Sequence, residues 1–125
     1  MIALLLESYT LLLRAEWRLR RGALSSLHGL VKHQAIRDRS KFGPRAPRDL
    51  MEAIDLACVF YPTQVLCLQR STATLLLLRR YGLKAELIIG AQTLPFKSHA
   101  WVEIDGAVVN DKPYMREIYR PMERW

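Results

Sequence analysis

One cysteine, one histidine and one aspartate follow each other along the sequence at positions that suit nucleophilic chemistry. The cysteine opens Cys67-Leu-Gln-Arg-Ser71, the histidine opens His99-Ala-Trp-Val-Glu103, and the aspartate follows in Asn110-Asp111. A thiolate nucleophile, an imidazole base and a carboxylate that orients the base are the working parts of a cysteine hydrolase. The sequence therefore predicts a catalytic triad of Cys67, His99 and Asp111.

The surroundings of Cys67 support the role of nucleophile. We expect a helix over residues 64–81, with Thr63 as its N-cap and Gly82 just beyond its end. Unpaired N–H groups in the first turn and the positive end of the helix dipole stabilise a thiolate there. Together with the backbone amide of Cys67 they can hold a developing oxyanion. Gln64 is a second candidate for that donor role, although a polar residue at a helix start is the plainer interpretation.

Three further residues are candidates for supporting roles. Arg70 and Ser71 lie one helical turn after the cysteine, where they either orient Asp111 or a substrate, or simply brace the helix. Trp101 shares one strand face with His99, because side chains alternate along a strand. The sequence alone does not decide between these roles.

The remaining cysteine and histidines are interpreted as structural. Cys58 is expected in the middle of a helix with no matched base, and His28 and His33 as surface residues of the N-terminal part. The two cysteines show no CxxC motif or ligand cluster, so we expect reduced thiols in a cytoplasmic protein. No metal and no cofactor are expected.

The loop between the last two expected strands decides where Asp111 points. A two-residue Asp105-Gly106 turn places Asp111 opposite Ala100 and directs it away from His99. A three-residue loop over 104–106, with a bulge at its glycine, places Asp111 opposite His99 at about 5 Å between Cβ atoms. We therefore expect the bulged loop if the triad exists.

Hydrophobic periodicity predicts helices followed by strands, which is the α+β class with an antiparallel sheet. The helices are expected at about 2–21, ending near Gly22, in a shorter stretch over 24–31, from Pro47 to Pro62, and at 64–81. A charged linker is expected at 37–48. The strands are expected at 84–89, 100–104 and 107–111, with a loop over 90–97.

These elements resemble one known family, the leader peptidases (B proteins) of lasso-peptide biosynthesis, which have a transglutaminase-like fold related to that of papain. The resemblance rests on the CLQRS, HAWVE and terminal Asp elements and extends from about Arg48 to Lys112. It implies that Cys67 is the nucleophile, His99 the base and Asp111 the acid. We expect a single domain over 1–125, with a helical, basic part at 1–47, the catalytic core at 48–112 and an unassigned tail at 113–125.

The resemblance also implies a reaction and partners. A B protein cuts the leader from a ribosomally made precursor peptide, and a partner cyclase then closes the ring. In some members a leader-recognition domain (RRE type) is fused to the protease, and in others it is a separate protein. Residues 1–47 lack the strand pattern of that domain, so the resemblance implies a stand-alone (split B2 type) protease that depends on a separate recognition protein.

The positive charge is concentrated in the N-terminal part of the chain. Residues 1–48 contain ten Lys/Arg against three Asp/Glu, so the whole net charge of +7 lies there. A solvated basic face and attraction of an acidic peptide or protein both explain this excess. Nucleic acid is not expected, because no binding module is recognisable. No membrane span is expected either, because Glu7 and Arg14 interrupt the apolar stretch at the start.

Two alternative functions remain at this stage. Another transglutaminase-like acyl-transfer enzyme or amidase would share the triad and differ in the acyl acceptor. A non-catalytic basic module that binds a peptide or protein would need no reactive thiol. Precursor sequence, cleavage site and oligomeric state are beyond the sequence.

Overall fold

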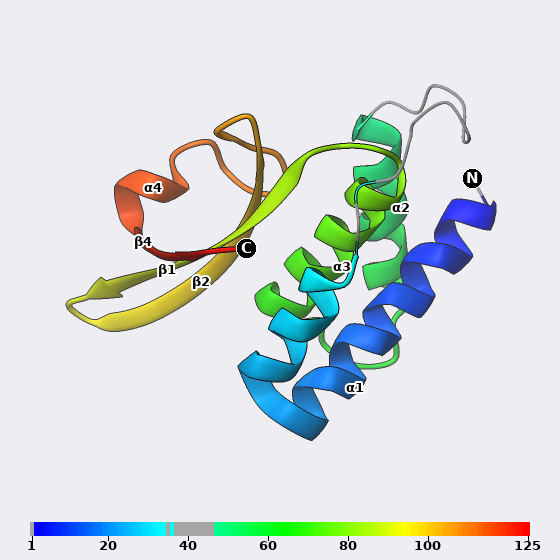
Figure 1. Cartoon of the computed structure of the whole chain (residues 1–125), viewed down its shortest axis with the longest axis horizontal. Helices are drawn as coiled ribbons and strands as arrows, with labels where there is room; N and C mark the ends of the chain where they lie inside the picture. The colour runs from blue at the N-terminus through cyan, green and yellow to red at the C-terminus, as the bar shows by residue number, and fades with distance from the viewer. Residues whose placement is uncertain (1, 35, 37–46) are drawn as a thin grey trace.

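Three helices pack side by side, and an antiparallel sheet covers one side of them (Figure 1). The computed structural model describes residues 2–34, 36 and 47–125. The linker predicted over 37–48 lies outside the described residues, except that its last two residues begin a helix. The α+β class with helices first is confirmed.

Helix α1 spans Ile2–Lys32 without interruption. The predicted end near Gly22 is therefore wrong, although Figure 1 shows that the helix axis changes direction in this part of the chain. The helix continues because the apolar residues beyond the bend also face the core. Leu27, Leu30 and Val31 are buried, as are Leu11 and others before the bend.

Helices α2 and α3 complete the helical layer. Helix α2, Pro47–Val59, begins at the expected proline and buries Leu50 and Ile54. Helix α3, Cys67–Arg80, is the central helix, since its run of leucines over 75–78 is fully buried between α1, α2 and the sheet. The predicted central buried helix is confirmed.

The end of α3 follows the prediction, whereas its start does not. Gly82 adopts a φ of 84°, and Leu83 N–H donates to Leu78 C=O at 3.0 Å, the arrangement of a glycine-terminated helix. At the other end the N-cap is Leu66, not Thr63, and the helix begins at Cys67 itself. The three residues before Leu66 are non-helical.

The sheet has the strand order β3-β2-β1-β4. Strands β1, Ala85–Thr93, and β2, Phe96–Ile104, form one long hairpin in which Thr93 pairs with Phe96. The loop predicted over 90–97 is therefore wrong. The pattern concealed the hairpin because the first three residues of β2 are all exposed and lack the alternation of a half-buried strand.

Strand β3, Ala107–Val108, is short and joins β2 through a two-residue turn. Ile104 pairs with Ala107, and Asp105 and Gly106 have φ values of 51° and 81°. Two successive positive φ values define the turn that matches strand twist in tight hairpins. The bulged three-residue loop predicted for the triad is therefore wrong.

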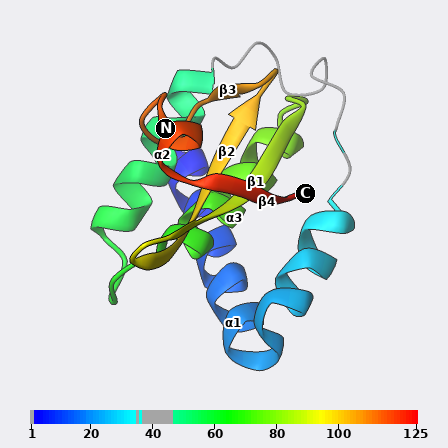
Figure 2. The ribbon, with the colours of Figure 1, turned by 90° about the vertical axis from the view of Figure 1, so that its left-hand side faces the viewer.

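The tail over 113–125 forms two elements. Helix α4, Met115–Ile118, is a single turn, and strand β4, Arg120–Arg124, pairs antiparallel with β1. Figure 2 looks onto the sheet and shows the red C-terminal segment lying beside β1. Met115 is buried against Ile88 and Trp101 in a second, smaller core on the sheet face opposite the helices. The tail is thus part of the same folded unit.

Candidate active site

His99 and Asp111 are in direct contact. Nε2 of His99 lies 2.6 Å from Oδ2 of Asp111, and both side chains are about one quarter exposed, at 25% and 24%. The other carboxylate oxygen accepts a hydrogen bond from Lys112 N–H at 2.8 Å. Burial alone would raise the pKa of Asp111, but the hydrogen bonds from His99 and Lys112 outweigh it and lower that pKa. Asp111 is therefore ionised at neutral pH beside the imidazole.

The contact forms without the bulge because the chain leaves the β ladder before Asp111. Val109 N–H still donates to Val102 C=O at 2.9 Å. The side chain of Asn110 then takes the place of a paired strand, since its Oδ1 accepts from Val102 N–H at 2.7 Å. Beyond that point the backbone is no longer bound to strict alternation, and Asp111 turns to His99. Sequence reasoning missed this role of Asn110.

Ser71 ties helix α3 to both halves of this pair. Its hydroxyl donates to Ala100 C=O at 2.9 Å and accepts from Asn110 Nδ2 at 3.0 Å. Ala100 follows His99, and Asn110 precedes Asp111. Ser71 is buried and lies one helical turn after Cys67, so the start of α3 is fixed near the strand segments that carry the pair. Of the two roles left open for Ser71, bracing is the one its contacts support.

Cys67 occupies the first position of α3 and is an exposed free thiol. Leu66, the N-cap, makes no side-chain hydrogen bond to the first turn. The N–H groups that helices leave unpaired at this end therefore receive no capping side chain from it. Gln64 lies in the extended segment before the helix and is exposed, so it is not one helical turn before Cys67 as predicted.

The side chain of Arg70 extends from α3 toward α2. Its guanidinium forms an ion pair with Asp55. Its charge also contributes, after the hydrogen bonds described above, to the lowered pKa of Asp111. Arg70 thus adds positive charge to the region of Asp111 while bracing α3 against α2.

An ionic cluster around the buried carboxylate of Glu103 lies on the sheet face that carries His99. Trp101 and Glu103 are 0% and 1% exposed, and Trp101 Nε1 donates to Glu103 at 2.8 Å. Arg116 of α4 makes two hydrogen bonds to the same carboxylate, one of them at 2.9 Å from Nε. Burial would raise the pKa of Glu103, but the donors Arg116 and Trp101 lower it. The indole N–H of Trp101 therefore belongs to this cluster through its hydrogen bond to Glu103.

Tyr119 covers the imidazole and was missed by sequence reasoning. Its ring stacks on His99 with centroids 5.3 Å apart and 25° between planes. Gly90 makes this approach possible, because a Cβ there would lie 2.6 Å from Trp101 and 2.9 Å from Tyr119. The only signal in the sequence was a glycine inside a strand-like segment, which often marks a close approach of another group.

The remaining cysteine and histidines have other surroundings. Cys58 is a half-buried free thiol near the end of α2, and burial raises its pKa. His28 stacks on Trp125 at 4.6 Å, and His33 is exposed at the end of α1. Within the described ranges, no three His, Cys, Asp or Glu side chains gather as a metal site. No described helix is long and apolar enough to cross a membrane.

Helix α3 begins at a cysteine, and it is braced against the strands that carry the His–Asp pair. This arrangement agrees with a match to the sequence model of the Transglutaminase-like superfamily. That model matches residues 9–124, so the chain belongs to this superfamily.

The chain is also similar to the microcin J25-processing protein McjB of Escherichia coli, with 47% identity over 51 residues. The aligned stretch covers 41% of this chain and 24% of McjB, so the chain spans about a quarter of the relative it matches. This similarity confirms the resemblance to the B proteins of lasso-peptide biosynthesis. No solved structure matches the chain.

Proposed function

We propose that this protein is a cysteine peptidase that removes the leader from a ribosomally made lasso-peptide precursor. The observation that carries the proposal is the His99–Asp111 hydrogen bond of 2.6 Å, held by Ser71 and Asn110 beside the helix that begins at Cys67. The name of the similar protein McjB, which describes processing of microcin J25, supports the same function.

The tautomer of His99 follows from its partner. The ionised carboxylate of Asp111 accepts the hydrogen bond, so Nε2 of His99 is the donor and carries the hydrogen of the neutral imidazole. The lone pair of Nδ1 is then free to take the proton of the Cys67 thiol. Asp111 fixes this tautomer and stabilises the imidazolium that forms.

The reaction proceeds in two halves. The Cys67 sulfur attacks the carbonyl carbon of the scissile peptide bond, and the C–N bond breaks as His99 gives its proton to the leaving amine. Water then attacks the thioester and gives a proton to His99, the C–S bond breaks, and His99 passes the proton to the departing Cys67 thiolate. The Cys67 amide and the first-turn N–H groups of α3 stabilise the oxyanion in both halves.

Partners belong to the same proposal. A separate leader-recognition protein of the RRE type delivers the precursor, and a cyclase uses the new amino terminus. The basic outer side of α1 supports an acidic partner, since Arg14, Arg20 and Arg21 are all exposed there.

Two other functions are distinguishable by experiment. A transglutaminase-like acyl transferase or an amidase would pass the acyl group from Cys67 to an amine, or act on a side-chain amide, which mass spectrometry of the products detects. A non-catalytic basic module would bind peptide with an unreactive thiol. The paired His99 and Asp111 favour the enzymes, because a binding module has no use for an oriented base.

The proposal is tested with a synthetic precursor peptide, the recognition protein and this protein. Cys67→Ala and His99→Ala should each abolish leader removal while circular dichroism shows an intact fold. Cys58→Ala is the matched control and should retain near-normal activity. Full cleavage by a folded Cys67→Ala variant would contradict the assignment of the nucleophile.

A further inference from the structure

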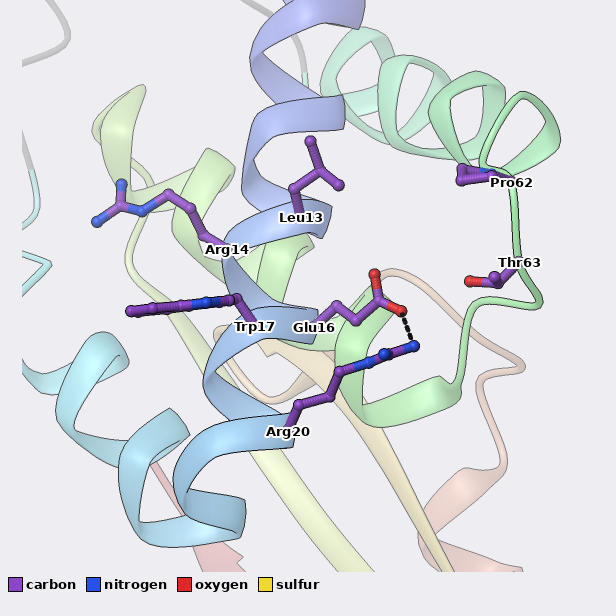
Figure 3. Close-up of a pocket in the computed structure, with 7 residues that line it drawn as sticks. All are labelled: Leu13, Arg14, Glu16, Trp17, Arg20, Pro62 and Thr63. Atoms are coloured by element: carbon purple, nitrogen blue, oxygen red, sulfur yellow. Dashed lines mark hydrogen bonds and ion pairs between the residues drawn. The ribbon is translucent and has the colours of Figure 1, made fainter.

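A cavity of about 550 Å³ lies between the middle of α1 and the segment Pro62-Thr63. Figure 3 shows that Leu13 and Glu16 extend toward this segment, while Arg14 and Trp17 line the cavity from the edge of α1 that is farther from the segment. Leu13 and Trp17 are 44% and 55% exposed. The cavity thus offers two partly exposed apolar side chains, and the guanidinium of Arg21 lies over the Trp17 ring at 4.5 Å from its centroid.

A second cavity of about 410 Å³ continues the first toward the start of α3. The two cavities share three lining residues, Glu16, Arg20 and Thr63. The second is also lined by Leu66, which is 60% exposed and immediately precedes Cys67. The two cavities therefore form one groove, here named the α1 groove, that leads from Trp17 to the candidate nucleophile.

The charge in the α1 groove is positive. Glu16 already accepts from Arg20 at 3.1 Å and from the hydroxyl of Tyr61. Arg14 lines the groove, is exposed, and makes no ion pair with any residue that the structure describes. A ligand in the groove therefore meets an apolar wall beside a guanidinium that lacks a carboxylate.

We propose that the α1 groove binds an extended segment of the substrate peptide in which a large apolar side chain lies next to an acidic one. The apolar side chain packs on Leu13 and Trp17 in the first cavity, and the carboxylate pairs with Arg14. The inference rests on the proposed function, because the occupant is the peptide cut at Cys67. Leu66, the residue before Cys67, lines the second cavity, so the bound segment is close in sequence to the cut bond.

Peptide binding to the Cys67→Ala protein tests this proposal without catalysis. The probes are three capped octapeptides of Gly and Ser that contain Leu-Glu, Leu-Lys or Ser-Glu at their centre. The indole N–H signal of Trp17, assigned with Trp17→Phe, reports occupancy by NMR. The Leu-Glu peptide should shift this signal saturably, and the other two should bind about tenfold more weakly or less.

Two exposed leucines of α1 provide the matched variants. Leu13→Ser removes part of the apolar wall and should weaken binding of the Leu-Glu peptide about tenfold. Leu6 is 63% exposed and does not line either cavity, so Leu6→Ser should leave binding unchanged. Arg14→Gln should abolish the preference for Leu-Glu over Leu-Lys. Circular dichroism verifies that each variant folds.

Three results would overturn the inference: equal binding of all three peptides, an unchanged affinity in Leu13→Ser, or a Trp17 signal that shifts on dilution without peptide. The last would mean that a second copy of the chain occupies the groove. Precursor cleavage that depends on Cys67 but ignores Leu13→Ser and Arg14→Gln would leave the proposed function intact and reject the groove. Binding of the Leu-Glu peptide by a protein that does not cleave the precursor would support the α1 groove and reject the proposed function.

Discussion

At the scale of single residues, the chemistry proposed here depends on which nitrogen of His99 is free. The Nε2–Asp111 hydrogen bond occupies one ring nitrogen, and Tyr119 stacked on the ring limits its rotation. Two different contacts thus hold the imidazole with Nδ1 available. A histidine restrained in this way is suited to exchange a proton with one fixed partner.

Asp111→Asn should reduce leader cleavage by roughly 10- to 1000-fold, less than Cys67→Ala or His99→Ala. The amide still contacts the imidazole but cannot stabilise its positive charge. The measurement is kcat/KM for the precursor, with Asp105→Asn at the exposed turn as the control. Activity equal to wild type would remove Asp111 from the mechanism.

The three candidate residues could be selected from the sequence because a helix start, a strand and a strand end each have a recognisable local pattern. The contact between His99 and Asp111 was predicted for the wrong reason. Strand alternation required a bulge, whereas the chain reaches His99 because Asn110 replaces the ladder with a side-chain hydrogen bond. Such a bond depends on tertiary position and has no periodic signature.

At the scale of elements, Asn110 is the residue that converts a short strand into a positioned loop. Its amide satisfies Val102 N–H at 2.7 Å and Ser71 Oγ at 3.0 Å, and so joins β2 to α3. Both partners are buried. The position of Asp111 therefore depends on this side chain.

Asn110→Ala should lower the free energy of unfolding by about 1–3 kcal/mol, since it leaves a buried N–H without an acceptor. It should also reduce precursor cleavage, because Asp111 loses its support. Chemical denaturation and kcat/KM provide the two measurements, and Asp105→Asn serves as the control, since asparagine tolerates the positive φ of 51° at this turn. Normal activity in a destabilised Asn110→Ala protein would show that Asp111 is positioned by other contacts.

The ionic cluster of Glu103 and Arg116 fixes the C-terminal elements to the sheet. This cluster could not be predicted from the sequence, because the tail has no hydrophobic period and an acidic residue on a strand face is usually solvated. Its partner Arg116 lies thirteen residues away, on a helix of one turn. Long-range pairs of this kind cannot be derived from local propensity.

Acid stability should report this cluster. The pKa of Glu103 is lower in the folded protein than in the unfolded chain, so its ionisation stabilises the fold above the ordinary glutamate range of about 4.3. This contribution is lost as pH falls through the lowered folded pKa. Glu103→Gln should therefore destabilise the protein by about 1–3 kcal/mol at pH 7 and by less at pH 3.

Thermal unfolding at the two pH values measures the effect, with the exposed Glu123→Gln of β4 as the control. An equal loss of stability at pH 7 and pH 3 would mean that the negative charge of Glu103 does not contribute to the stability of the fold.

At the scale of the whole molecule, the two sides of α1 differ in burial and charge. One side buries Leu4, Leu11 and Leu12 in the core. The other exposes Leu6 and Trp17 together with several arginines. The sequence indicated one apolar stripe and a basic excess, but it did not show that a second apolar stripe faces outward, because periodicity does not reveal which stripe has a partner.

Binding of the separate recognition protein should weaken with salt. Exposed charges are screened beyond about 10 Å at 0.1 M ionic strength. Reversal of Arg18 and Arg21 to Glu should lower the affinity about tenfold and leave the alkylation rate of Cys67 unchanged. Arg120→Glu on β4 is the control, and isothermal titration at two salt concentrations is the measurement. An affinity insensitive to salt and to reversal would make the basic side an ordinary solvated surface.

The central claim, that His99 and Asp111 activate Cys67, is tested most directly by the rate at which iodoacetamide labels each cysteine near neutral pH. Peptide mass spectrometry separates Cys67 from the half-buried Cys58, which serves as an internal reference in every sample. We expect fast labelling of Cys67 in the wild type. In His99→Ala the labelling rate of Cys67 should fall about tenfold or more, and that of Cys58 should not change. A labelling rate of Cys67 that is the same with and without His99 would contradict it.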